Sequence, residues 1–122
     1  IDKVEEFKIW GSGEPLREFL YVDDLASAVL FVINNEIKYD LLNIGSKEEI
    51  SIMDLSQKIK SIIDFKGNLV FDKSKPDGNP RKLLDSSKIF DLGWKPKVHL
   101  DQGLISTYRW YLENNIKEEI PK

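Results

Sequence analysis

Two short segments of this chain concentrate the residue types that bind phosphate and sugar groups. The first runs from Trp10 to Arg17 and joins an aromatic ring to a guanidinium through a turn with two glycines. The second, residues 72–82, carries four basic and two acidic side chains and is stiffened by two prolines. Arginine donates two parallel hydrogen bonds to phosphate, an aromatic ring stacks on a sugar or base, and a carboxylate accepts hydrogen bonds from hydroxyls. Together the two segments predict a site for a small phosphorylated ligand.

These side chains have ordinary structural explanations as well. Arg17 and Glu18 fit a solvated strand face, Trp10 fits a hydrophobic core, and residues 73–82 fit a surface loop. From residue types alone, these explanations stay open beside the binding site.

Several kinds of catalytic site are absent from the sequence. The chain has no cysteine, which excludes disulfides, thiolate nucleophiles and cysteine-bound zinc. Its single histidine, His99, argues against a histidine-rich metal site, and we interpret it as a surface or helix-start residue. Gly11 and Gly13 lack the third glycine of a dinucleotide-binding turn, and no tyrosine is followed four residues later by a lysine. We therefore expect no catalytic, cofactor-binding or metal-binding residue in this chain.

The composition is that of an ordinary folded protein. With 122 residues, 41% of them hydrophobic and 32% charged, the chain is long and apolar enough for one hydrophobic core. A net charge of -3 gives no general attraction to nucleic acid, and no run approaches the ~18 apolar residues of a membrane span. The absence of cysteine is compatible with a cytoplasmic location. The start at Ile1, without a basic and then apolar stretch, suggests a fragment that begins with no signal peptide.

Hydrophobic periodicity predicts short strands that alternate irregularly with helices, an α/β class with α+β-like features. Ser51 and Asp54 have the spacing of a capping box, and Asp23 and Asp24 fit the positive end of a helix. The predicted strands or extended segments are 7–10, 17–21, 41–44, 68–71 and 82–84. The predicted helices are 23–33, 52–63, a short one between Ser86 and Gly93, and 100–114.

Residues 9–26 read Ile-Trp-Gly-Ser-Gly-Glu-Pro-Leu-Arg-Glu-Phe-Leu-Tyr-Val-Asp-Asp-Leu-Ala and closely resemble the GDP-L-fucose synthase family. Residues 75–85, Lys-Pro-Asp-Gly-Asn-Pro-Arg-Lys-Leu-Leu-Asp, resemble the same family, as do residues 92–96 and 100–113. The Arg-Glu-Phe-x-x-Val-x-Asp core is common to many nucleotide-sugar epimerases and dehydratases of the extended short-chain dehydrogenase class. The Lys-Pro-Asp-Gly-x-Pro-Arg-Lys stretch is more specific. The resemblance spans residues 7–114.

This resemblance implies an enzyme that epimerises GDP-4-keto-6-deoxy-mannose and then reduces it to GDP-L-fucose with NADPH. In the family, the cofactor-binding and catalytic residues precede the segment present here. The isolated chain is therefore expected to be inactive and to bind no cofactor. Trp10, Arg17 and Asp77 match substrate-contacting positions, with Arg17 at the pyrophosphate. Arg81 matches a second phosphate-binding arginine of related epimerases, and Lys82 is a further substrate-binding candidate.

The resemblance also implies an incomplete architecture, the carboxyl-terminal substrate-binding part of an extended Rossmann-type epimerase without its amino-terminal dinucleotide-binding sheet. Residues 1–122 then form a single fragment. Residues 1–21 and 46–80 supply the substrate-binding subdomain, residues 22–45 resemble a helix and strand of the Rossmann domain, and residues 81–122 add a closing strand and helices. Because the Rossmann domain would be missing, we expect an exposed apolar patch that self-association of the fragment could cover.

Other functions remain open. The chain could belong to another nucleotide-sugar epimerase or dehydratase that acts on UDP, CDP or dTDP sugars, although the Lys-Pro-Asp-Gly stretch disfavours this. It could also be a stand-alone nucleotide-binding module or a purely structural fragment. The resemblance implies a GDP-sugar as the partner. The acidic charge and the lack of aromatic residues in the basic loop argue against nucleic acid.

Overall fold

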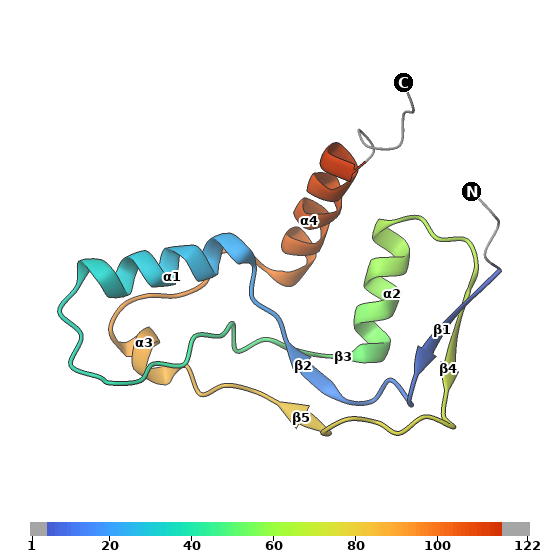
Figure 1. The fold of residues 1–122 in the computed structure, drawn as a ribbon, viewed down its shortest axis with the longest axis horizontal. Helices are drawn as coiled ribbons and strands as arrows, with labels where there is room; N and C mark the ends of the chain where they lie inside the picture. Colours follow the sequence, from blue (N-terminus) through green and yellow to red (C-terminus); the bar gives the residue numbers. More distant parts are fainter. Residues whose placement is uncertain (1–4, 116–122) are drawn as a thin grey trace.

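The computed structural model describes residues 5–115, which form two small sheets and four helices (Figure 1). The mixed α/β class predicted from the sequence is confirmed. The predicted ranges 1–21 and 81–122 extend beyond the described residues at their outer ends. Along the chain the elements are β1 (Glu6–Trp10), β2 (Leu16–Glu18), α1 (Val22–Asn34), β3 (Glu49–Ser51), α2 (Ile52–Ile62), β4 (Asn68–Asp72), β5 (Arg81–Lys82), α3 (Ser87–Asp91) and α4 (Leu100–Asn115).

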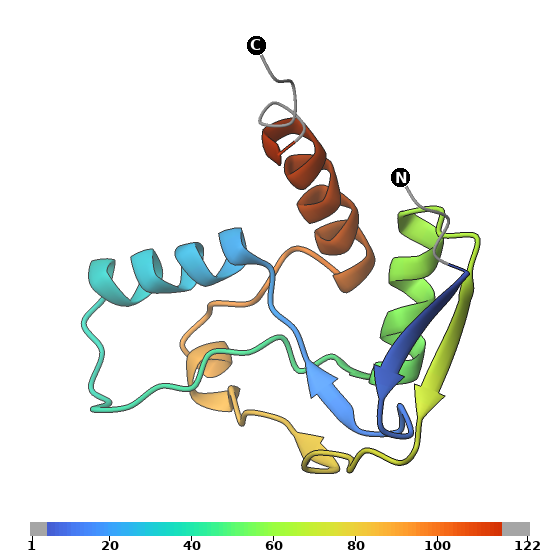
Figure 2. The same ribbon diagram turned by 45° about the vertical axis from the view of Figure 1, so that its right-hand side comes forward.

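Strands β1 and β4 pair in parallel, from Glu6 opposite Asn68 to Trp10 opposite Asp72. A parallel pair needs a long crossover, and this one includes helix α2, which lies beside the two strands (Figures 1 and 2). The start of α2 confirms Ser51 as the helix N-cap, with Asp54 as its partner. The Ser51 hydroxyl accepts a hydrogen bond from the Asp54 backbone N–H at 3.0 Å and donates one to Asp54 Oδ2 at 2.6 Å.

The second sheet has the strand order β3-β2-β5, so that β2 is its central strand. Strand β2 runs antiparallel to β3 and parallel to β5. In this register Arg17 lies opposite both Ile50 and Lys82. The backbone N–H of Leu16 donates to the Pro80 carbonyl at 2.8 Å, just before β5 begins. This pairing brings the loop of residues 73–80 to the turn that precedes β2.

The buried core lies between α1, α3 and the residues after α3. Ala28, Ile89 and Trp94 are its buried hydrophobic members among the described residues. Trp94 meets Phe90 edge to face, with ring centroids 6.1 Å apart, and its Nε1 donates to Ser27 Oγ at 2.9 Å. The remaining partly buried members of this cluster are Leu20, Phe31, Val32 and Ile44.

Asp24 has a structural role that the sequence did not reveal. Both Asp23 and Asp24 lie in the first turn of α1, as predicted, but Asp24 is only 3% exposed whereas Asp23 is exposed. The Asp24 carboxylate accepts hydrogen bonds from the backbone N–H groups of Lys97 at 3.1 Å and Val98 at 2.9 Å. It therefore ties the start of α1 to the segment that leads into α4.

The predicted strand at residues 41–44 is wrong, because these residues form no strand in the part of the chain that the structure describes. A strand needs a neighbouring strand to satisfy its backbone groups, and none lies beside this segment there. The predicted strand 82–84 begins one residue earlier and ends at Lys82. The N–H of Leu84 donates to the Glu18 side chain at 3.2 Å. The four predicted helices are confirmed within one or two residues.

Helix α1 leaves much of its apolar surface exposed. Ile33 is 71% exposed and Val22 is 65% exposed, and Leu25, Val29 and Leu30 are exposed as well. The segment after α1 continues this surface, with a hollow of about 490 Å³ lined by apolar residues of α1 and residues 37–44. The exposed apolar patch expected near residues 22–45 is therefore present. None of the described helices is long and apolar enough to cross a membrane.

Candidate functional site

Three of the predicted ligand-binding residues line one hollow. Trp10, Arg17 and Asp77 lie around a cavity of about 80 Å³, at the point where the turn after β1 meets the loop after β4. The remaining lining residues are Gly13, Pro15, Ile52, Pro76 and Gly78. The two segments that the sequence analysis singled out therefore converge.

Trp10 ends strand β1 and is 75% exposed, which excludes a role in the hydrophobic core. The Nζ atom of Lys75 lies 5.7 Å from the centroid of its ring, within cation–π range. An exposed aromatic ring beside a basic loop is suited to stack on a base or sugar.

The Arg17 side chain is held against the loop of residues 73–80. Its Nη1 atom donates hydrogen bonds to the carbonyl oxygens of Leu16 at 2.6 Å and Asn79 at 2.8 Å. A Cβ atom at Gly78 would stand 3.2 Å from Arg17 Nη2, so the glycine allows a close approach. These contacts orient the guanidinium without neutralising its charge, because backbone carbonyls carry no net charge.

Asp77 is held by Ser12. The Ser12 backbone N–H donates to Asp77 Oδ1 at 2.7 Å, and the Ser12 hydroxyl donates to Asp77 Oδ2 at 2.6 Å. These hydrogen bonds, the hydroxyl's first, lower the pKa of the Asp77 carboxyl, with a smaller contribution from the charge of Lys73. Asp77 is therefore an ionised acceptor in a fixed position.

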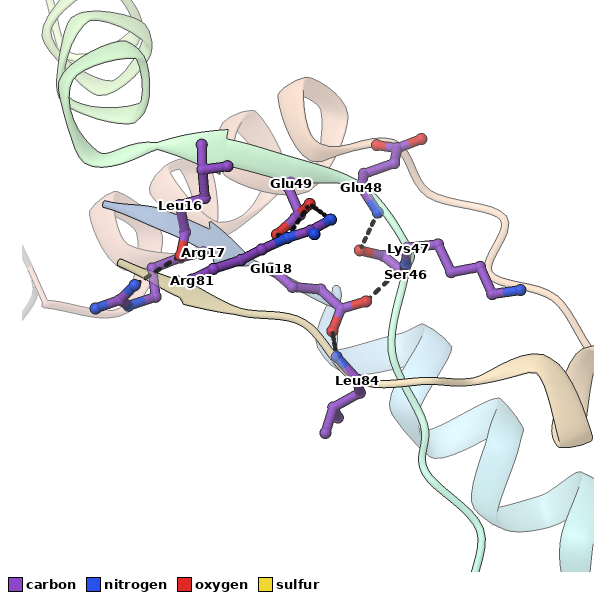
Figure 3. A network of polar contacts seen from close by, with 9 residues as sticks. All are labelled: Leu16, Arg17, Glu18, Ser46, Lys47, Glu48, Glu49, Arg81 and Leu84. Atoms are coloured by element: carbon purple, nitrogen blue, oxygen red, sulfur yellow. Dashed lines mark hydrogen bonds and ion pairs between the residues drawn. The ribbon is translucent and has the colours of Figure 1, made fainter. Parts of the chain in front are cut away.

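Arg81 has a different environment from Arg17. Its Nε donates to Glu49 Oε1 at 2.8 Å, and its Nη2 donates to Glu49 Oε2 at 2.6 Å (Figure 3). This fork geometry lowers the pKa of Glu49 and raises the pKa of Arg81, mainly through the side-chain hydrogen bonds. The pair joins β5 to β3 across the central strand.

The register of the sheet separates the two arginines. Side chains alternate between the faces of a strand, and residues directly opposite each other on paired strands share a face. Lys82 is opposite Arg17, whereas Arg81 is opposite Leu16. The register thus places Lys82 on the Arg17 face and Arg81 on the other, and Figure 3 shows the Arg81 side chain extending to Glu49, away from the Arg17 guanidinium.

Two polar residues that hold the surrounding segments together, Ser12 beside the hollow and Glu18 on the other face of β2, were not identified from the sequence. The sequence around Ser12 indicates only a turn. Glu18 accepts hydrogen bonds from the backbone N–H groups of Lys47 at 2.6 Å and Leu84 at 3.2 Å, and thereby connects β2 to the segments on either side (Figure 3). The residues next to Ser12 and Glu18 in the sequence do not predict these contacts, because the partners are 29 to 66 residues away along the chain.

Another hollow lacks the chemistry of a nucleotide site. It measures about 260 Å³, lies between β1 and α2, and its lining is almost wholly apolar, including Phe7, Ile59 and Phe65. It offers no set of converging polar groups, which ligand sites need for orientation. Within residues 5–115, no cluster of histidine, aspartate or glutamate side chains could hold a metal ion.

Comparison with known proteins finds similarity to nucleotide-sugar enzymes. Residues 1–45 match the NAD dependent epimerase/dehydratase family. The chain is 54% identical to the probable GDP-L-fucose synthase 1 of Oryza sativa over 91% of its own length and 34% of that protein. It is 44% identical to the GDP-L-fucose synthase of Escherichia coli, over 87% of its own length and 36% of that protein.

Solved structures agree with these sequence matches. The fold matches that of a GDP-L-fucose synthetase from Naegleria fowleri bound to NADP, with a TM-score of 0.83 and 34% identity. That match covers 96% of this chain and 37% of the other. A UDP-glucose 4-epimerase from Thermotoga maritima matches with a TM-score of 0.79 and 29% identity, over 90% of this chain and 36% of the other.

The chain is similar to members of the NAD dependent epimerase/dehydratase family, whose model matches its first 45 residues. Within that family its similarity is to GDP-L-fucose synthases, as the resemblance of residues 9–26 and 75–85 indicated. The chain spans about a third of the length of the curated relatives it matches.

Proposed function

We propose that this chain forms the GDP-sugar-binding portion of a GDP-L-fucose synthase, which epimerises and reduces GDP-4-keto-6-deoxy-mannose with NADPH. The observation that carries the proposal is the convergence of Trp10, Arg17 and Asp77 on one hollow. Relatives with 44–54% identity that are named GDP-L-fucose synthase support the choice of nucleotide and sugar.

In this proposal each side chain contributes one kind of contact. Arg17 donates hydrogen bonds to the pyrophosphate, and Lys82, on the same face of the sheet, adds a second positive charge. Trp10 stacks on the base or sugar, and Asp77 accepts hydrogen bonds from hydroxyls or from the base. Arg81 would reach a phosphate only by releasing Glu49.

The hollow holds only part of such a ligand. Its volume of about 80 Å³ is well below the roughly 300–1,000 Å³ of complete ligand pockets. We propose that a Rossmann domain outside residues 1–122 completes the cleft, carries the catalytic residues and binds NADPH. Residues 1–21 and 46–80 would form most of the substrate side, and α1 with residues 35–45 would pack against that domain. In this proposal residues 1–122 alone are inactive, and the whole enzyme is cytoplasmic.

The decisive experiment measures GDP binding by calorimetry in the native protein, including any residues that its gene encodes beyond 1–122. We expect Arg17→Ala to weaken binding roughly tenfold to hundredfold, because a hydrogen bond to a charged group contributes about 1.5–3 kcal/mol. Arg109 is the matched control, since it is exposed on α4 and does not line the hollow. Equal affinities for the wild type and Arg17→Ala would refute the role of Arg17.

A second candidate is an enzyme acting on another nucleotide sugar. It is favoured by the 37% identity to a putative UDP-glucose 4-epimerase of Methanocaldococcus jannaschii and by the match to the Thermotoga epimerase. Competition of GDP, UDP, CDP and dTDP for the native protein distinguishes the two candidates. If a nucleotide binds but NADPH is never oxidised with any keto-sugar, the stand-alone binding module is the better description.

A further inference from the structure

Hydrogen bonds connect the turn after β1 to the loop after β4, beyond the point where the parallel pairing of the two strands ends. The Gly11 N–H donates to the Asp72 carbonyl at 3.0 Å, directly after the paired strands. Past that point the connection is made by Ser12, whose N–H and hydroxyl each donate to one carboxylate oxygen of Asp77. Ser12 therefore determines where the Asp77 carboxylate lies.

The surroundings of Ser12 leave its hydroxyl with one orientation. The Ser12 Oγ atom also accepts a hydrogen bond from the Glu14 N–H at 3.1 Å, so its single hydrogen is directed to Asp77. Gly11 has a φ of +88°, and a Cβ atom there would stand 2.2 Å from Asp77 Oδ1. Glycine is thus required for the carboxylate to approach the turn this closely.

The position of Asp77 matters because Arg17 lines the same hollow. A carboxylate and a guanidinium that line the same small hollow can form a bidentate pair. The structure shows no ion pair between them; Arg17 binds the carbonyls of Leu16 and Asn79, and Asp77 binds Ser12. Each charge therefore remains available to a ligand, and Asp77, with about four acceptor positions, retains two beyond those that Ser12 uses.

We propose that Ser12 is a positioning residue that holds the Asp77 carboxylate away from Arg17, so that the hollow offers a ligand a separate cation and a separate acceptor. This inference rests on the proposed function, since it assigns Ser12 to the same GDP-sugar site. The hydrogen bonds from Ser12 also favour the ionised form of Asp77, which keeps the acceptor charged while it is held apart.

The test compares Ser12→Ala with Ser12→Thr in the native protein, with GDP and inorganic pyrophosphate as calorimetric probes. Ser12→Ala frees Asp77 to pair with Arg17, and we expect both probes to bind about two- to tenfold more weakly. Ser12→Thr keeps the hydroxyl and should retain wild-type affinity. In an Asp77→Asn background, Ser12→Ala should have no further effect on pyrophosphate, because the competing carboxylate is gone.

A merely structural role for Ser12 predicts a different pattern. In that case Ser12→Ala would weaken binding equally in the wild-type and Asp77→Asn backgrounds, and this result would overturn the proposal. Wild-type affinity in Ser12→Ala would overturn it as well.

A ligand-free measurement separates this inference from the proposed function. Carbon NMR titration of the Asp77 carboxyl in Ser12→Ala should still show a lowered pKa, now caused by Arg17, and the pKa should rise when Arg17→Ala is added. If the wild type binds no nucleotide, the proposed function fails and this titration still decides the role of Ser12. A pKa of Asp77 that is indifferent to Arg17 in the Ser12→Ala protein would refute the inference.

Discussion

Arg81 on β5 reaches across the central strand β2 to Glu49 on β3, with 2.6 Å between Nη2 and Oε2. Glu49 is directly opposite Glu18, so two carboxylates share one face of the sheet. Like charges in that position destabilise a sheet unless each has its own partner. Glu18 accepts hydrogen bonds from the backbone N–H groups of Lys47 and Leu84, and Glu49 accepts hydrogen bonds from the Arg81 side chain.

This arrangement predicts that Arg81 and Glu49 act on stability as a pair. Arg81→Gln leaves Glu49 facing Glu18 without compensation, and its melting temperature should fall below that of Lys82→Gln, the neighbouring control. Adding Glu49→Gln to Arg81→Gln should recover part of the loss, because the uncompensated charge is removed. Thermal unfolding followed by circular dichroism at two salt concentrations measures the coupling.

Binding data on the same variants decide whether Arg81 also contacts phosphate. If Arg81 serves only to connect β5 to β3, GDP affinity is unchanged in Glu49→Gln and falls in Lys82→Gln. If Arg81 leaves Glu49 to bind phosphate, Glu49→Gln instead raises GDP affinity, since the competing carboxylate has been neutralised. The second outcome would support the role that the family resemblance implied for Arg81.

Substituting Asp23 and substituting the neighbouring Asp24 should have very different effects on the free energy of unfolding. Asp24→Ala leaves the N–H groups of Lys97 and Val98 without their acceptor, and we expect the free energy of unfolding to drop by about 1–3 kcal/mol. Asp23→Ala removes only an exposed charge at the helix start and should cost less than about 1 kcal/mol. Urea denaturation of both variants compares them directly, and equal losses would contradict the assigned role of Asp24.

Three aspartates with lowered pKa values predict how the stability of the fold depends on acid. Hydrogen bonds from serine side chains and backbone lower the pKa of Asp72, Asp77 and Asp85. A carboxyl whose folded pKa lies below its unfolded value near 3.9 stabilises the fold above that value. The contribution is lost as the pH falls through the lower, folded pKa. The melting temperature should therefore decline below about pH 4, and Asp85→Asn should reduce the steepness of that decline.

The apolar face of α1 predicts the solution behaviour of residues 1–122 on their own. This face exposes Val22, Leu25, Val29 and Ile33, and a solvent-exposed apolar surface favours self-association. We expect the isolated chain to bind a hydrophobic dye and to scatter light as more than a monomer. Ile33→Lys should reduce both signals, whereas substituting the exposed Tyr111 of α4 should change them less. A compact monomer without dye binding would contradict the prediction.

Local sequence signals predicted the four described helices because their causes are local. The Ser51–Asp54 capping box spans four residues, and the apolar stripe of α2 repeats within its own turns. The same holds for the helix stop at Gly93, whose φ of +108° suits a residue without a Cβ atom. Residues 41–44 failed as a strand because a strand depends on a partner elsewhere in the chain, which a run of apolar residues does not specify.

By itself, the sequence determined which residue types are available for binding, since an aromatic ring, a guanidinium and a basic loop that contains Asp77 are recognisable by type and order. Only the tertiary structure decided how they are used. The register between β2 and β5 placed Lys82 on the face of Arg17 and Arg81 on the opposite face, although the two basic residues are neighbours in the chain. The physical reason is that side chains alternate along a strand, so the pairing of distant segments determines which of two adjacent charges shares the face of Arg17.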